Sequence, residues 1–270
     1  MRSFTALACT IAVTACTGTD GDILRTRPDG AVPVTGRPRP APLSTWQIQL
    51  SGVLDTTIDV RSYIVDVATP ASVIRGLHDA GRIVLCYFSA GTLEPFRADA
   101  SRFPASALGA PLADYPDERW VDVRDATVRA IMQDRVIAAA GAGCDGIDPS
   151  GLAAFQESTN LDFTRDDQVD YDRWLAAVAH GLGLSIGLVQ ADAALSQDLV
   201  ADFDWAVLWT CLDTSCAPAA PFTGASKAVF LIEYGDETQV SAVCPKARSL
   251  GLSAIIKRDG NLDAFRVGCP

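Results

Sequence analysis

The sequence predicts a single parallel α/β domain closed into a TIM-type (β/α)8 barrel, preceded by a signal peptide and a proline-rich linker. Three observations support this fold class. From Thr45 onward, short apolar runs alternate with helix-length segments, which is typical of repeated βα units. There are eight such runs, the number of parallel strands that closes a barrel. No second linker divides the chain, and barrels of roughly 200–250 residues commonly form one domain.

The eight apolar runs are strand candidates because they are short, rich in β-branched and aromatic residues, and bounded by turn residues. They span residues 46–50, 62–67, 83–88, 146–148, 185–189, 205–209, 228–234 and 253–257. A doubly wound open sheet is the alternative arrangement of the same units. That fold favours a glycine-rich phosphate loop after its first strand, and residues 49–53 contain one glycine.

The segments between the strands carry helix signals. One apolar face at 3.6-residue spacing is made by Val128, Ile131, Met132, Val136 and Ile137. A second helix is predicted to begin at Thr164, with Asp167 completing a capping box, and to close at Gly181. Pro245 interrupts the helix before the last strand and predicts a kink or a late helix start.

The N-terminal region predicts export. Residues 1–15 combine Arg2 with an uncharged apolar stretch that is too short to span a bilayer, as in a signal peptide. The small residues before Cys16 resemble the lipobox of bacterial lipoproteins, so Cys16 is the predicted lipidation site. Ordinary cleavage without lipidation is the alternative. Residues 16–44 predict a disordered linker, and residues 45–270 form the barrel. We therefore expect an envelope lipoprotein or a secreted protein.

Charge restricts the possible partners. The chain has a formal net charge of −11, and no cluster of lysine or arginine falls in the predicted barrel. An acidic surface repels phosphate backbones, which argues against a nucleic acid partner and favours a cationic ligand. Membrane contact is expected through the lipid anchor only, and the protein is expected to be a monomer.

Six cysteines fall within the predicted barrel: Cys86, Cys144, Cys211, Cys216, Cys244 and Cys269. An even number in an oxidising compartment favours disulfides. A zinc site is the competing interpretation. It is disfavoured because the chain has no Cys-x2-Cys pair, and because His78 and His180 lie in helix-like segments far from any cysteine. We expect no metal and no cofactor.

Candidate functional residues follow from the rule that a barrel carries its active site at the C-terminal ends of its strands. Carboxylates and aromatic residues dominate these positions: Asp66, Tyr87, Asp145, Asp148, Asp192, Trp209, Asp213, Glu233, Tyr234 and Asp259, with Gln190, Lys257 and Arg258 among them. Neither histidine ends a strand, so a Ser-His-Asp triad is improbable. Paired carboxylates with aromatic platforms suit glycoside hydrolysis.

Five segments together resemble glycoside hydrolase family 114: residues 46–52, 86–91, 143–149, 183–188 and 227–235. The resemblance extends from about Trp46 to Cys269. That family comprises endo-α-1,4-polygalactosaminidases and related proteins on a TIM-type barrel. The resemblance implies a protein that acts on or binds α-1,4-linked galactosamine polymers without a metal or organic cofactor. Deacetylated galactosamine is cationic, which suits an acidic protein.

The same resemblance guides the expected cysteine pairing and the expected site. The implied disulfides join Cys86 to Cys144, Cys211 to Cys216, and Cys244 to Cys269. Two positions that carry catalytic carboxylates in the family differ here. Ser150 stands at the nucleophile position after the fourth strand, and Trp209 stands at the acid/base position after the sixth.

Two main hypotheses remain open. In the first, the protein is an active hydrolase in which Asp148 and Glu233 are the catalytic pair. In the second, it is a non-catalytic carbohydrate-binding barrel of the cell envelope in which Trp209 stacks on a sugar. The predicted substrate-binding residues are Asp66, Tyr87, Ser150, Gln190, Trp209, Tyr234 and Lys257. A purely structural envelope protein does not explain why acids and aromatic residues gather at one end of the barrel.

Overall fold

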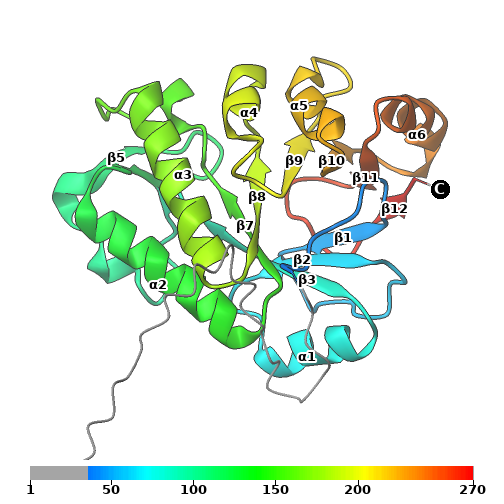
Figure 1. Cartoon of the computed structure of the whole chain (residues 1–270), viewed down its shortest axis with the longest axis horizontal. Coiled ribbons are helices and arrows are strands. Elements are labelled where there is room, and N and C mark those ends of the chain that lie inside the picture. The colour runs from blue at the N-terminus through cyan, green and yellow to red at the C-terminus, as the bar shows by residue number, and fades with distance from the viewer. Residues whose placement is uncertain (1–35, 270) are drawn as a thin grey trace, which may run out of the picture.

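The computed structural model describes residues 36–269. It contains a curled sheet of nine strands, in the order β1-β2-β3-β7-β8-β9-β10-β11-β12 (Figure 1). The first eight of these are parallel to one another, and β12 is antiparallel to β11. The predicted signal peptide, Cys16 and most of the linker lie outside the described residues.

All eight predicted strands are present, with ends that differ from the prediction by at most two residues. They are β1 (Trp46–Gln49), β2 (Ser62–Asp66), β3 (Ile83–Ser89), β7 (Gly146–Ser150), β8 (Ser185–Val189), β9 (Trp205–Trp209), β10 (Ala228–Tyr234) and β11 (Ser253–Lys257). The short β12 (Val267–Gly268) was not predicted.

Within residues 36–269, six α-helices lie outside the curled sheet (Figure 1). They are α1 (Ala71–Asp79), α2 (Ala126–Ala142), α3 (Arg165–Gly181), α4 (Ala193–Leu199), α5 (Ala220–Gly224) and α6 (Val240–Ser249). The predicted capping box opens α3, because the Thr164 hydroxyl and the Asp167 carboxylate each accept the other residue's backbone N–H. The chain turns after Gly181 at Gly183, whose φ is 71°.

The prediction of a late helix start at Pro245 is wrong. Helix α6 begins at Val240 and continues through Pro245 to Ser249. A proline within a helix deprives the carbonyl four residues earlier of its partner. That carbonyl belongs to Ser241, in the first turn of α6, so the helix loses a bond near its N-terminal end rather than in its middle.

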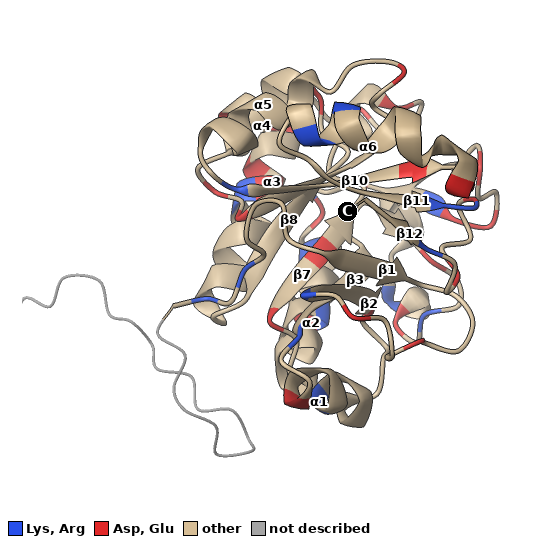
Figure 2. Ribbon diagram, turned by 90° about the vertical axis from the view of Figure 1, so that its right-hand side faces the viewer, with Lys and Arg blue, Asp and Glu red and all other residues tan. Residues whose placement is uncertain are grey.

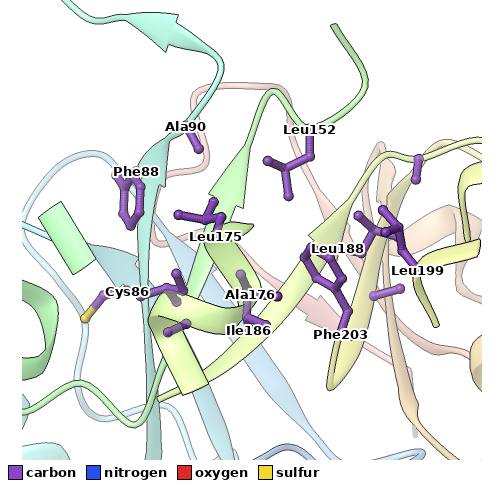
Figure 3. Packing of buried hydrophobic residues seen from close by; sticks show 14 of the residues in the cluster. Cys86, Phe88, Ala90, Leu152, Leu175, Ala176, Ile186, Leu188, Leu199 and Phe203 are labelled. Atoms are coloured by element: carbon purple, nitrogen blue, oxygen red, sulfur yellow. The ribbon is translucent and has the colours of Figure 1, made fainter. Parts of the chain in front are cut away.

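Two hydrophobic layers hold the barrel together. Inside the curled sheet, Trp46 stacks on Phe230 with ring centroids 4.3 Å apart. The indole of Trp205 fills the space beside Gly187, where a Cβ would lie 2.4 Å from Trp205 Nε1. Outside the sheet, the faces of the strands pack on the helices. Figure 3 shows this layer around Leu175 and Ile186.

Side chains close the barrel at the seam between β1 and β11, where no backbone ladder joins the two strands among the described residues. Trp46 Nε1 donates to the carbonyl of Ser253 at 2.7 Å, and Arg266 Nε donates to the carbonyl of Trp46 at 2.8 Å. Lys257 Nζ donates to the carbonyl of Ile48 at 3.0 Å. These bonds satisfy carbonyl groups that a paired strand would otherwise satisfy.

Both histidines lie in helices, α1 and α3, and contact aspartates at the N-terminal ends of the strands. His78 Nε2 lies 2.8 Å from Asp145, and His180 Nε2 lies 2.9 Å from Asp204. Each aspartate precedes a strand and also accepts a backbone N–H at the start of the neighbouring strand. This end of a barrel is associated with stability rather than chemistry, so the two pairs anchor helices to strands.

The structure includes residues 36–44, the end of the predicted linker, with the barrel. The carbonyl of Pro38 accepts a hydrogen bond from the Ser185 hydroxyl at 2.6 Å. Arg39 lies 3.9 Å from Asp204. Within the described residues, no helix has the length and apolar composition needed to cross a membrane. Figure 2 shows charged residues spread over the helices and loops.

Among the described residues, three disulfides form as expected. Cys86 on β3 is joined to Cys144 before β7, which links neighbouring strands. The Cys211–Cys216 disulfide closes a short loop after β9. The third joins Cys244 of α6 to Cys269 beyond β12.

A second, three-stranded antiparallel sheet was not predicted. It consists of β4 (Thr92–Leu93), β5 (Leu108–Pro111) and β6 (Arg119–Val121), in the order β4-β6-β5. It is an insertion between β3 and α2. Because β4 follows β3 closely, the insertion begins at the C-terminal end of the barrel, where sites form.

Candidate active site

A cavity of about 870 Å³ opens at the C-terminal ends of the strands. Four of the residues predicted to bind substrate line it: Asp66 from β2, Tyr87 from β3, Ser150 from β7 and Trp209 from β9. Strand alternation explains this grouping. Each of these side chains points to the same, inner face of the sheet as the buried residue two positions earlier in its strand, which is apolar in β2, β3 and β9 and is Asp148 in β7.

The insertion forms the opposite wall of the cavity. Its lining residues include Glu94, Phe96, Arg97, Tyr115, Glu118 and Trp120. Phe96 and Tyr115 are 71% and 52% exposed, which is unusual for aromatic side chains. With Tyr87 and Trp209, the wall brings aromatic rings to several sides of one cavity, an arrangement that suits sugar faces.

Arg97 organises the charges of the cavity. Its guanidinium donates to both carboxylate oxygens of Asp66, at 2.9 and 3.2 Å, and to both oxygens of Glu94. Arg135 makes a similar two-pronged contact with Asp99 at 2.8 Å and donates to the carbonyl of Ser89 at 2.7 Å. The two carboxylates hold the pKa of Arg97 above its ordinary value despite partial burial.

Glu118 is less well compensated than the other carboxylates of the cavity. Its Oε2 accepts a hydrogen bond from the Thr92 hydroxyl at 2.9 Å. Burial raises the pKa of Glu118, the Thr92 hydrogen bond lowers it, the charge of nearby Glu94 raises it, and the charge of Arg97 lowers it, so that the pKa remains above its ordinary value. Counting Asp66, Glu94, Asp99 and Glu118 against two arginines, the cavity carries excess negative charge.

Ser150 lies at the floor of the cavity beside Tyr87. The Tyr87 hydroxyl and Ser150 Oγ are 3.0 Å apart. Tyr87 is partly buried, and burial raises the pKa of its phenol well above the ordinary value. At neutral pH the pair is therefore two neutral hydroxyls. Neither of them is a base that could activate water or a sugar hydroxyl.

Asp148 lies beneath this floor, inside the barrel, and does not line the cavity. Its side chain is 2% exposed, and its Oδ1 has no hydrogen-bond partner among residues 36–269. Burial raises the pKa of Asp148 from 3.8 to about 7, and the Trp205 indole opposes part of this rise. Asp148 is thus a buried carboxyl that still holds its proton in part of the molecules at neutral pH.

Glu233 points to the other face of the sheet. Its neighbours Ile232 and Tyr234 pack inside the barrel, so alternation directs Glu233 toward the helices. Its Oε1 accepts the backbone N–H of Leu212 at 3.1 Å, in the loop that the Cys211–Cys216 disulfide closes. Burial raises the pKa of Glu233. The structure therefore does not bring Asp148 and Glu233 together across a gap that a sugar could occupy.

Gln190 forms a hydrogen bond with the backbone of Trp209. Its Oε1 accepts the backbone N–H of Trp209 at 2.9 Å. Gln190 and Thr210 both have positive φ, 53° and 50°, a conformation that costs free energy in residues other than glycine. Two strained residues thus flank Trp209. Trp209 lines the cavity, and its buried indole Nε1 has no hydrogen-bond partner among the described residues.

The last two predicted binding residues, Tyr234 and Lys257, do not line the cavity. Tyr234 is half-buried beside the mouth, and burial raises its pKa to about 12. Lys257 is fully buried inside the barrel, where its ammonium binds the carbonyls of Ile48 and Asp263. Burial lowers the pKa of Lys257 to about 8. Its position at the β1–β11 seam gives it a structural use.

The family model of glycoside-hydrolase family GH114 matches residues 29–270. The chain belongs to this family. The match covers the whole folded part and confirms the resemblance inferred from the five sequence segments. A search of curated protein sequences gives no match to this protein.

Two solved structures place this GH114 chain among known relatives. It is similar to Aspergillus fumigatus Ega3, crystallised in complex with galactosamine, with 35% identity and a TM-score of 0.82 over 87% of this chain and 99% of that one. It also has the fold of the glycoside hydrolase domain of Pseudomonas aeruginosa PelA. There the identity is 15% and the TM-score 0.69, over 83% of this chain and 98% of that one. Together with the family match, the similarity to Ega3 supports a glycoside hydrolase-like function.

Sequence reasoning missed the insertion residues, including Glu94, Arg97 and Glu118. One signal could have pointed to them. The connection from the third to the fourth predicted strand is much longer than a single helix requires, and long connections at this end of a barrel often carry function. Within residues 36–269, no group of three or more histidine, cysteine, aspartate or glutamate side chains is arranged to hold a metal ion.

Proposed function

We propose that this GH114 protein binds a cationic amino-sugar polysaccharide of the α-1,4-linked galactosamine type and does not hydrolyse it. The observation that carries this proposal is the content of the cavity at the ends of β7 and β9. Ser150 and Trp209 occupy those positions, and neither side chain can serve as a carboxylate nucleophile or acid. Asp148 and Glu233, the catalytic pair expected from the sequence, lie on opposite faces of the sheet.

The lining of the cavity supports an amino sugar as the ligand. Aromatic rings from Tyr87, Phe96 and Trp209 supply flat apolar surfaces for sugar faces. The four carboxylates and two arginines leave excess negative charge, which favours a cationic ligand over a neutral or anionic one. The similarity to Ega3, whose structure contains galactosamine, points to the same class of sugar.

The proposed location is the cell envelope. We infer that residues 1–15 are removed as a signal peptide and that Cys16 carries a lipid, so that the linker tethers the barrel to a membrane. Three disulfides support export, because they persist in oxidising compartments. A secreted form without the lipid would keep the same binding site.

Titration calorimetry tests the binding. The protein without residues 1–15, and with Cys16 replaced by serine, would be titrated with α-1,4-linked galactosamine oligomers. We expect Trp209→Ala to weaken the affinity about tenfold or more, which corresponds to about 1.4 kcal/mol. Trp174→Ala is the matched control, because Trp174 stacks on Tyr171 of α3 and does not line the cavity.

Two results would contradict the proposal. If wild-type protein shows no detectable binding, the assigned ligand is wrong. If Trp209→Ala binds as tightly as wild type, the assigned binding site is wrong. A parallel incubation of the same oligomers at high protein concentration tests hydrolysis. We expect no new reducing ends. Turnover that Asp148→Asn abolishes would instead establish the active hydrolase.

A further inference from the structure

The carboxylates of the cavity differ in how well their charges are compensated. Asp66 and Glu94 each receive two hydrogen bonds from Arg97, and Glu94 also lies 3.5 Å from Arg135. Glu94 is 2% exposed, so this network is built into the wall. The arginines therefore already compensate the negative charges of Asp66 and Glu94.

Glu118 differs from them in each respect. It makes no ion pair with an arginine or lysine among the described residues, and its side chain accepts a hydrogen bond from the neutral hydroxyl of Thr92 at 2.9 Å. That hydroxyl lies 2.5 Å from the hydroxyl of Ser89, so a chain of hydroxyls fixes the direction of the Glu118 side chain. The second oxygen, Oε1, accepts no hydrogen bond from the described residues.

The surroundings make an uncompensated charge at Glu118 costly. The side chain is partly buried, burial and the nearby charge of Glu94 raise its pKa, and the Thr92 hydrogen bond and the charge of Arg97 offset only part of this rise. A cation that enters the cavity and contacts Oε1 would relieve both effects, since an opposite charge stabilises the ionised form. The same wall carries Trp120 and Phe96, so a sugar ring could pack on an aromatic face while its substituent reaches Glu118.

We propose that the Glu118 carboxylate binds the ammonium group of an unacetylated amino sugar, and that this contact makes the cavity select free-amine sugars over N-acetylated ones. The inference rests on the proposed function, because it assigns selectivity within the same cavity. An N-acetyl group carries no charge and replaces the ammonium with a bulkier amide. It would leave Glu118 uncompensated and buried beneath the ligand, which is unfavourable.

Calorimetry with two matched ligands tests the selectivity. Wild-type protein would be titrated with a galactosamine oligomer and with its fully N-acetylated counterpart. We expect the amine form to bind about 10- to 100-fold more tightly, the range of a hydrogen-bonded charge contact. Glu118→Gln keeps the shape and the Thr92 contact but removes the charge. It should reduce the affinity for the amine form by a similar factor, and it should strengthen binding of the acetylated form or leave it unchanged, because the buried charge is gone.

Asp117→Asn is the matched control, because it removes the same charge from the adjacent exposed residue, which does not line the cavity. It should leave both affinities within about twofold. Thermal unfolding of each variant would show that the fold is intact. Glu118→Asp retains the charge on a shorter side chain and should restore part of the preference for the amine.

The outcomes separate this inference from the proposed function. If wild-type protein binds neither oligomer, the proposed function fails. If it binds both equally, or if Glu118→Gln weakens both by the same factor, the protein binds sugars but Glu118 does not select the amine. If Asp117→Asn has the same effect as Glu118→Gln, the preference comes from overall charge, and the assignment to Glu118 is overturned.

Discussion

Replacing Asp148 with asparagine is predicted to remove a large pH dependence from the stability of the protein. Asp148 is 2% exposed, and burial raises its pKa from 3.8 to about 7. Between these values the folded state holds a proton that the unfolded state has lost. The free energy of unfolding therefore falls as pH rises from about 4 to 7, because ionising the buried carboxyl favours the unfolded chain.

The magnitude follows from the two pKa values. A rise from 3.8 to about 7 corresponds to about 4 kcal/mol of stability lost once Asp148 is fully ionised. About 1.5 kcal/mol of this is already lost at pH 5, so about 2.5 kcal/mol remains between pH 5 and pH 8. Asparagine has nearly the same shape and does not ionise. Its amide needs a partner and costs about 1–3 kcal/mol, but that cost does not depend on pH.

Chemical denaturation of wild-type protein and Asp148→Asn at pH 5 and pH 8, with disulfides intact, measures the effect. Relative to wild type, the variant should gain about 2.5 kcal/mol on moving from pH 5 to pH 8. Asp114→Asn, which removes an exposed carboxylate, should show no comparable gain. The reasoning is refuted if the stability difference between Asp148→Asn and wild type is the same at both pH values.

Three further changes test the scaffold. Thr164→Ala removes the capping box of α3 and should lower the free energy of unfolding by about 1 kcal/mol in urea denaturation; no loss would mean that the cap is unimportant. Lys257→Met removes the buried ammonium that binds the carbonyl of Ile48 and should cost about 1–3 kcal/mol, visible as a lower Tm; unchanged stability would contradict the side-chain closure of the barrel. Joint replacement of Cys211 and Cys216 by serine opens the loop after Trp209. It should reduce the free energy of oligosaccharide binding by more than it reduces the free energy of unfolding. Binding equal to wild type would show that the disulfide does not support the site.

Sequence patterns predicted the barrel well because each of its strands is a compact apolar run. Residues 185–189, 205–209, 228–234 and 253–257 match the observed strands in full. The insertion escaped prediction for the opposite reason. Its strands contain two to four residues, too few to show a period of two, and Pro111 ends one of them.

The direction of the site residues could not be read from the same runs. A strand buried on both faces is apolar throughout, so it lacks the alternation that separates inward from outward positions. Glu233 ends such a run and was expected beside Asp148, but it faces the helices. Lys257 likewise ends a buried strand. Its ammonium serves the β1–β11 seam, a role that depends on how the sheet curls rather than on any local pattern.

A crystal structure of the protein with an α-1,4-linked galactosamine oligomer would test the central claim most directly. We predict an intact oligosaccharide in the cavity at the ends of β2, β3, β7 and β9, with one ring on the face of Trp209. Cleaved products in that cavity, or an intact ligand bound elsewhere on the molecule, would contradict a non-hydrolysing binding site built on Ser150 and Trp209.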